Sequence, residues 1–192
     1  NQDITALDED DLSRIQSKFG FLFQGAALFD SLTVAENVLF GVRNLKPREL
    51  VRGDAIVERC LALVGLKPEV AALKPAELSG GMKKRVGLAR AIAHEPEYIL
   101  YDEPTTGLDP IMSDVINDLI VGIRAKLKIT SIAVTHDLKS AYKISSRIAM
   151  IHEGRLVAVG TPDEIQRSDN PLVQQFITGS SQGPIQMPVR SY

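Results

Sequence analysis

Two adjacent carboxylates, Asp102 and Glu103, directly follow the bulky apolar run Tyr98 to Tyr101. Such a run predicts a buried strand, and open α/β sheets bind their ligands at the carboxyl ends of the strands. Asp102 is then placed to hold Mg²⁺, a hard cation that favours oxygen ligands, and Glu103 to orient and deprotonate an attacking water. The pair by itself is more simply explained as two acids that end a strand.

A second candidate site is the segment Leu78-Ser79-Gly80-Gly81-Met82. A serine hydroxyl, two residues without side chains and a helix N-terminus together present N–H donors and a positive dipole end to an anion. The alternative is an ordinary N-capped helix after a glycine turn. The basic residues that follow either support anion binding or form a solvated basic face: Lys83, Lys84, Arg85 and Arg90.

These residues need a framework of helices and strands to position them. Ser79 is expected to cap a helix that runs to about His94, and Val115 to Ile123 shows the spacing of another helix. Buried strands are expected at Phe19 to Phe23, at Tyr98 to Tyr101 and at Ile129 to Val134. Helices that alternate with apolar strands indicate an α/β domain with a largely parallel sheet.

Between the first strand and Ser79 the sequence predicts mainly helix. Apolar residues recur with helical spacing from Val34 to Leu45, where Lys46-Pro47 interrupts the pattern. A second amphipathic helix contains Ile56 to Val64 and ends at Gly65. The region 37–77 is therefore expected to form a small helical subdomain.

The last third of the chain predicts smaller elements. Glu153-Gly154 joins two strand-like segments into a hairpin, and Thr161-Pro162-Asp163-Glu164 is a capping box with proline at the first helical position. A short helix should end at Gly179. From Ser180 onward the composition predicts an irregular tail, docked, if at all, on something else.

Composition narrows the function classes. The 192 residues are 44% hydrophobic and 24% charged, which is ordinary for a globular protein. A net charge of −2 gives no general reason to expect nucleic-acid binding. Cys60 is the single cysteine, so neither an internal disulfide nor a cysteine-rich metal site can form. No apolar stretch is long enough to cross a bilayer, so any membrane association is expected to be peripheral.

The order of five motifs resembles the ATP-binding-cassette (ABC) ATPase family over nearly the whole chain. In order, they are Gln24 after a strand, Leu78 to Met82, Asp102-Glu103, Gly107-Leu108-Asp109, and His136 at a strand end. The resemblance implies an α/β core like that of P-loop NTPases, with a mostly parallel sheet and a small helical subdomain. It implies a partial core with the Q-loop at 1–36, the helical subdomain at 37–77, the remaining core at 78–179 and a tail at 180–192.

The resemblance assigns four residues to the chemistry of ATP and Mg²⁺. Gln24 matches the Q-loop glutamine, which contacts Mg²⁺ and the water, and Asp102 matches the Walker B metal carboxylate. Glu103 matches the catalytic base, and His136 matches the switch histidine that hydrogen-bonds the γ-phosphate. These roles agree with phosphoryl transfer to water, which depends on positioning and charge neutralisation.

The remaining motifs imply that two copies act together. Ser79, Gly80 and Gly81 match the signature motif, which binds the γ-phosphate of ATP held by the opposite subunit, and Asp109 matches the D-loop aspartate at the dimer interface. Position 82 is Met where most relatives carry Gln. A head-to-tail pair is therefore expected to be needed for catalysis, and a monomer to be nearly inactive.

The phosphate-loop pattern of glycines followed by Lys-Ser/Thr is absent from the sequence. Gly20 and Gly25 have the glycine spacing, but Ala26 and Ala27 follow them. In the family this loop lies upstream of the Q-loop, and here Asn1 to Phe23 precede Gln24. The expectation is that an N-terminal portion is missing from this chain, which would then bind ATP weakly and hydrolyse little.

Three segments resemble the Mla (Ttg2-type) phospholipid transporters: Phe23 to Val38, Leu78 to Arg85, and Gln175 to Ile185. The resemblance implies an ATPase peripheral to the cytoplasmic side of the inner membrane of a Gram-negative bacterium. It also implies a membrane permease, a second copy of the ATPase, a substrate-binding protein with a mammalian-cell-entry domain and a small regulatory subunit as partners, and no nucleic acid. The alternatives are another ABC importer, for example of amino acids, a soluble non-transport ABC ATPase, and a non-catalytic binding module.

Overall fold

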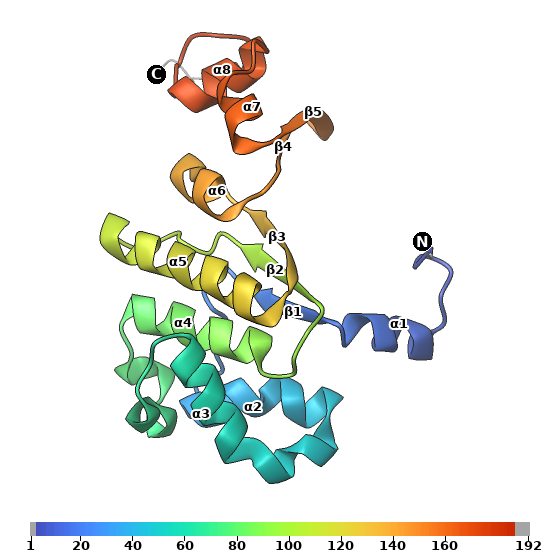
Figure 1. The fold of residues 1–192 in the computed structure, drawn as a ribbon, viewed down its shortest axis with the longest axis vertical. Coiled ribbons are helices and arrows are strands. Elements are labelled where there is room, and N and C mark those ends of the chain that lie inside the picture. Colours follow the sequence, from blue (N-terminus) through green and yellow to red (C-terminus); the bar gives the residue numbers. More distant parts are fainter. Residues whose placement is uncertain (1–2, 187–192) are drawn as a thin grey trace, which may run out of the picture. The chain divides into compact units, whose positions relative to one another are not determined.

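A computed structural model describes residues 3–186, which divide into two units that are treated separately, 3–135 and 136–186. The first unit contains three strands, β1 (Phe19–Leu22), β2 (Tyr98–Asp102) and β3 (Thr130–Val134). Its α-helices are α1 (Glu9–Gln16), α2 (Val34–Leu45), α3 (Gly53–Leu63), α4 (Gly80–Ile92) and α5 (Pro110–Leu127). The predicted alternation of helices and strands is confirmed (Figure 1).

The three strands of the first unit form a parallel sheet in the order β1-β2-β3. Leu22 pairs with Tyr101 and Tyr101 with Ala133, so the ends of the strands meet at one edge. Because side chains alternate along a strand, Leu22, Ile99 and Tyr101 share one face, and all three are buried. The residues that follow each strand, among them Gln24 and Glu103, are therefore brought to the same edge of the sheet.

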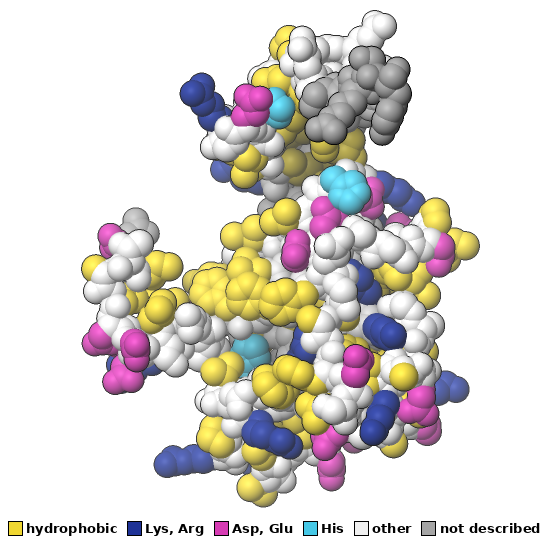
Figure 2. All heavy atoms as spheres, turned by 180° about the vertical axis from the view of Figure 1, so that it is seen from behind, with side chains coloured by type: hydrophobic (Ala, Val, Ile, Leu, Met, Phe, Trp, Pro, Cys, Tyr) yellow, Lys and Arg dark blue, Asp and Glu magenta, His cyan; other side chains and the backbone are white. Residues whose placement is uncertain are grey.

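The opposite face of this sheet is exposed, which corrects part of the expectation of buried strands. Phe21, Ile132 and Val134 are 45%, 63% and 64% exposed, and Phe23 just beyond β1 is also exposed. Figure 2 shows a band of hydrophobic side chains on the view from behind. Parallel sheets normally bury both faces, so an apolar strand sequence predicted burial that only one face achieves here.

The helical region begins with a complete capping box. The Thr33 hydroxyl accepts from the Glu36 amide, and the Glu36 carboxylate accepts from the Thr33 amide at 2.8 Å. Short 3₁₀ segments connect the helices: η1 (Pro47–Arg52), η2 (Pro68–Ala72) and η3 (Pro75–Glu77). Gly65 adopts φ +66° just after α3, as its predicted role at the helix end requires. Helices α2 and α3 both pack on α4.

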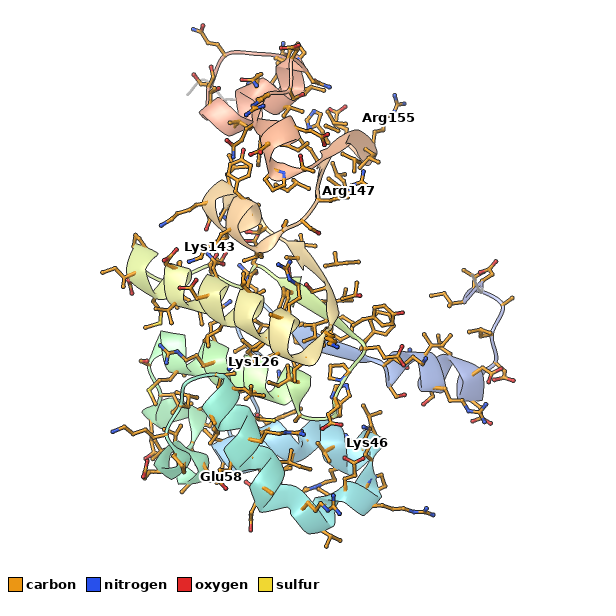
Figure 3. All side chains as sticks on the ribbon, viewed as in Figure 1. Lys46, Glu58, Lys126, Lys143, Arg147 and Arg155 are labelled. Atoms are coloured by element: carbon orange, nitrogen blue, oxygen red, sulfur yellow. The ribbon has the colours of Figure 1, made fainter. Side chains whose placement is uncertain are left out.

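The second unit contains the hairpin that the sequence predicted. Strand β4 (Ile148–His152) pairs antiparallel with β5 (Arg155–Gly160), and Glu153 and Gly154 both have positive φ. Figure 3 labels Arg147 just before β4 and Arg155 at the start of β5. The helices of this unit are α6 (Leu138–Ile144), α7 (Pro162–Gln166), which starts with the expected capping box at Thr161, and α8 (Pro171–Thr178).

The segment 180–186 is irregular, as predicted, but it docks on its own unit rather than on something else. The Gln175 side-chain amide of α8 donates to the carbonyls of Ser180 and Ile185, and its oxygen accepts from the Ile185 amide at 2.6 Å. Gln175 is 8% exposed. The sequence did not indicate that one buried amide could satisfy three main-chain groups of the returning segment. Residues 187–192 of the predicted tail lie outside the described residues.

The predicted boundaries at 36/37, 77/78 and 179/180 stay predictions. Within residues 3–186, none of the helices is long and apolar enough to span a membrane.

Candidate functional site

The catalytic candidates of the first unit lie where β1 and β2 end. Asp102 is the last residue of β2 and is exposed, while Glu103 follows it in a left-handed conformation with φ +45°. Residues with a Cβ rarely adopt this conformation, so it must be held by neighbours. The Glu103 amide donates to the Val134 carbonyl at 2.9 Å, which ties the residue to the end of β3.

Two threonine hydroxyls hold the Glu103 carboxylate. The Thr106 hydroxyl donates to Oε2 at 2.9 Å, and the Thr135 hydroxyl donates to the same oxygen at 3.3 Å. Glu103 is partly exposed, so its carboxylate is oriented without being sealed from solvent. Such a carboxylate can accept a proton from a water at the sheet edge. Nothing in the sequence pattern marked the two threonines, although both lie within one or two residues of predicted strand ends or motifs.

Gln24 lies at the end of β1 with its side chain exposed. The segment after it turns through Ala26 and Ala27, which have φ of +61° and +45°. Arg90 of α4 holds this turn, since its two terminal nitrogens donate to the Ala26 and Ala27 carbonyls at 2.6 Å each. The Arg90 guanidinium also lies 6.0 Å from the centre of the Phe29 ring. The Q-loop candidate is therefore held by the helix that carries the signature candidate.

Lys84 joins the two groups of catalytic candidates. Its ammonium donates to the Gln24 carbonyl and, at 2.9 Å, to the Glu103 carbonyl. Lys84 is only 4% exposed, so a solvated basic face is the wrong interpretation for this residue. Burial lowers the pKa of the Lys84 ammonium, and the negative charges of Asp102 and Glu103 act in the opposite direction.

The signature candidate forms the start of α4. Ser79 is the N-cap, and its hydroxyl accepts from the Met82 amide at 3.3 Å. Ser79 and Gly80 are exposed at the helix N-terminus, where free N–H groups and the helix dipole favour an anion. Gly81 is buried, and a Cβ built on it would lie 2.8 Å from the Met112 sulfur of α5. Gly81 therefore allows a close approach between this end of α4 and Met112.

The D-loop candidate adjoins the signature candidate. Asp109 caps α5, and its carboxylate accepts from the Ile111 and Met112 amides at 3.0 Å each. A Cβ built on Gly80 would lie 3.8 Å from Leu108. The structure thus brings Gln24 together with Glu103, and Gly80 and Gly81 together with Leu108 and Met112. His136 is the first residue of the second unit, and its role with the other residues stays a prediction.

Asp102 and Gln24 fit a magnesium site in which the phosphates of ATP would supply some of the ligands. Within residues 3–186, no group of three or more His, Cys, Asp and Glu could hold a metal ion. Mg²⁺ is usually bound by one or two carboxylates, with substrate phosphates and waters as the other ligands. The exposed carboxylate of Asp102 and the exposed amide of Gln24 suit that mode.

Comparison with known proteins identifies the family. The family model described as "ABC transporter" matches residues 1–106. The chain is 40% identical over its full length to the intermembrane phospholipid transport system ATP-binding protein MlaF of Haemophilus influenzae, of which it covers 73%. This chain belongs to the ABC transporter family. Members of the family bind and hydrolyse ATP, as the motifs predicted.

Other relatives are similar over less of their length. The chain is 44% identical to the Arabidopsis thaliana protein TRIGALACTOSYLDIACYLGLYCEROL 3, chloroplastic, across 88% of this chain and 53% of that one. It is 39% identical to a Mycobacterium bovis protein named as a probable ribonucleotide transport ATP-binding protein, across 96% of this chain and 51% of that one. The chain thus spans about half the length of these two relatives.

Solved structures support the same fold. A dimeric ATP-binding cassette bound to ADP and phosphate superimposes with a TM-score of 0.70 at 32% identity, across 82% of this chain and 68% of that one. The structure of cbiO1 from Clostridium perfringens, part of the ABC transporter complex cbiONQ, gives a TM-score of 0.75 at 30% identity, across 85% and 64% of the two chains. The α/β ABC cassette predicted from the sequence is confirmed.

Proposed function

We propose that this chain is the ATP-hydrolysing part of an ABC transporter that moves phospholipid between the inner and outer membranes of a Gram-negative bacterium. The observation that carries the ATPase part is the convergence at the sheet edge of Gln24, Asp102 and the oriented carboxylate of Glu103. The phospholipid part is supported by 40% identity over the full chain to the Haemophilus influenzae relative.

In the proposed reaction, Gln24 and Asp102 would hold Mg²⁺ together with ATP, and Glu103 would orient and deprotonate the attacking water. The ion supplies charge neutralisation at the phosphates when it is bound. The hydroxyls of Thr106 and Thr135 fix the orientation of the Glu103 carboxylate through their hydrogen bonds. Phosphoryl transfer depends on such positioning of the catalytic groups. His136 would contact the γ-phosphate.

The proposed assembly contains two copies of the ATPase and a membrane permease, at the cytoplasmic side of the inner membrane. A substrate-binding protein with a mammalian-cell-entry domain and a small regulatory subunit would complete it. The exposed N-terminus of α4 at Ser79 and Gly80 suits a ligand presented by another subunit. The exposed apolar sheet face suits cover by a further element, and we propose that a segment with the phosphate loop supplies it.

Glu103→Gln tests the ATPase part, measured on the complex purified from membranes with its permease. Loss of a general base is expected to lower kcat by about 10² or more. Glu97→Gln is the matched control, because Glu97 precedes β2 at the opposite end and forms an exposed ion pair with Lys18. Equal activity of the two variants would show that Glu103 is not the base.

The transported molecule is tested on the same complex. Phospholipid vesicles are expected to stimulate its ATP hydrolysis, and bound phospholipid should be found by mass spectrometry of the purified complex. The mycobacterial relative supports a second candidate, a ribonucleotide transporter. Stimulation by ribonucleotides, or by amino acids, without any effect of phospholipid would select the alternative transporters.

A further inference from the structure

Lys84 is unusual among the basic residues of α4 because its ammonium is buried and its two acceptors come from different loops. The acceptors are the main-chain carbonyls of Gln24 and Glu103, which follow β1 and β2. These two strands are neighbours in the parallel sheet. A single ammonium thus crosslinks the main chains of two loops that leave the same sheet edge.

We propose that Lys84 is a positioning residue that fixes the spacing between the Gln24 loop and the Glu103 loop. The inference rests on the proposed function only where it calls Glu103 the base. The left-handed backbone of Glu103 needs external support, and the Lys84 bond to its carbonyl supplies part of it. Hydrogen bonds from a charged donor are the strong ones in proteins, so one ammonium can hold both loops.

Of the two loops, the rest of this face of α4 contacts only the Gln24 loop. Gly87 and Arg90 follow Lys84 at positions i+3 and i+6, and a Cβ built on Gly87 would lie 3.1 Å from the Ala26 Cβ. Arg90 donates to the Ala26 and Ala27 carbonyls. Arg90 therefore reaches one of the two loops, whereas Lys84 reaches both, and this difference separates the two residues experimentally.

Hydrogen exchange of the 192-residue chain tests the proposal without ATP. The Ala26 amide, which donates to the Phe23 carbonyl at 2.9 Å, reports on the Gln24 loop. The Thr106 amide, which donates to the Glu103 carbonyl at 3.3 Å, reports on the Glu103 loop. Lys84→Met keeps the length of the side chain and removes its donors.

The expected pattern differs between three variants. Lys84→Met should accelerate exchange of both reporter amides by about tenfold or more, since each loses support from a charged donor. Arg90→Met should accelerate only Ala26, and Lys83→Met, one position earlier on the helix and less buried, should change neither. Lys84→Arg should restore protection, because its fork can reach two carbonyls.

The proposal would be overturned if Lys84→Met accelerated amide exchange in one loop only, or no more than Lys83→Met does. If Lys84→Met does not fold, Lys84→Gln replaces it, because the shorter neutral side chain of glutamine cannot span both carbonyls. Exchange of both reporter amides should again accelerate in this variant. Unchanged protection of the two amides would overturn the proposal. In the assembled transporter, Lys84→Gln should lower kcat with little change in the KM for ATP. An inactive wild-type complex would refute the proposed function while leaving the exchange result to decide the role of Lys84.

Discussion

Replacement of Gly87 by alanine is expected to destabilise the protein, although alanine is the better helix former. A Cβ built at this position lies 2.9 Å from the Leu22 Cδ1 atom, 3.1 Å from the Ala26 Cβ and 3.4 Å from the Ala26 Cα. Leu22 and Ala26 are each 1% exposed, so neither has open space to move into. Ala26 is further held by the bond from Arg90 to its carbonyl.

The magnitude follows from two opposed effects. Glycine to alanine in a helix interior contributes about 1 kcal/mol of stability, whereas an extra methyl group in a packed site costs about 1–3 kcal/mol. Because the neighbours here are a packed leucine and Ala26, whose carbonyl is held by Arg90, the upper part of that range applies, and a net loss of about 1–2 kcal/mol is expected. Gly122 in α5 is the matched control, since a Cβ there meets nothing within 4 Å. Gly122→Ala should gain about 0.5–1 kcal/mol.

Urea unfolding followed by circular dichroism measures both changes. The midpoint should fall for Gly87→Ala and rise for Gly122→Ala, with the same dependence on urea concentration in both. A stabilisation of Gly87→Ala equal to that of Gly122→Ala would refute the close approach between α4 and the Gln24 loop. It would also mean that tight packing at Gly87 does not help α4 to hold the Gln24 loop.

Two further predictions concern buried polar side chains. His94 is 5% exposed, and its Nδ1 has no partner among the described residues. Burial lowers its pKa more than the hydrogen bond with the Phe19 carbonyl raises it. The histidine therefore binds a proton at higher pH in the unfolded protein than in the folded one, so the free energy of unfolding should be full above the ordinary pKa of 6.5 and fall as the pH drops below it. The urea midpoint of His94→Gln should depend less on pH between 7 and 5 than that of the wild type. An equally steep dependence in the variant would contradict this prediction. Gln175→Ala should release the segment 180–186, which limited proteolysis should detect as earlier cleavage there than in Gln174→Ala, with α8 still folded.

The helices and the positions of the strands along the chain could be predicted from the sequence because their signals are local. Ser79, Thr161 and Gly65 mark helix ends through their own hydrogen bonds or backbone angles, and the structure has each of them in that role. Burial of a strand face is different, because it depends on what packs over the face. The apolar strands β1 and β3 therefore predicted more burial than Phe21 and Ile132 have.

The candidate site shows the same division between local and distant information. Asp102, Glu103 and Ser79 belong to contiguous motifs whose order indicated the family, while the contacts of Lys84 depend on which side of α4 faces the strand ends. From the sequence alone, Lys84 could equally belong to a solvated basic face. The glycine at position 87, between Lys84 and Arg90 on one helix face, was a usable signal, because glycine in a helix can allow another chain segment to come close.

Helix α4 carries two separate surfaces, and this has a consequence for the proposed pair of cassettes. Its N-terminus at Ser79 and Gly80 is exposed, whereas its flank at Lys84 and Arg90 holds the loops of its own chain. In a head-to-tail pair, each α4 would then contact the nucleotide of the other cassette while positioning the base of its own. A displacement of the helix by the permease would disturb both sites at once, because a packed helix moves as one rigid element.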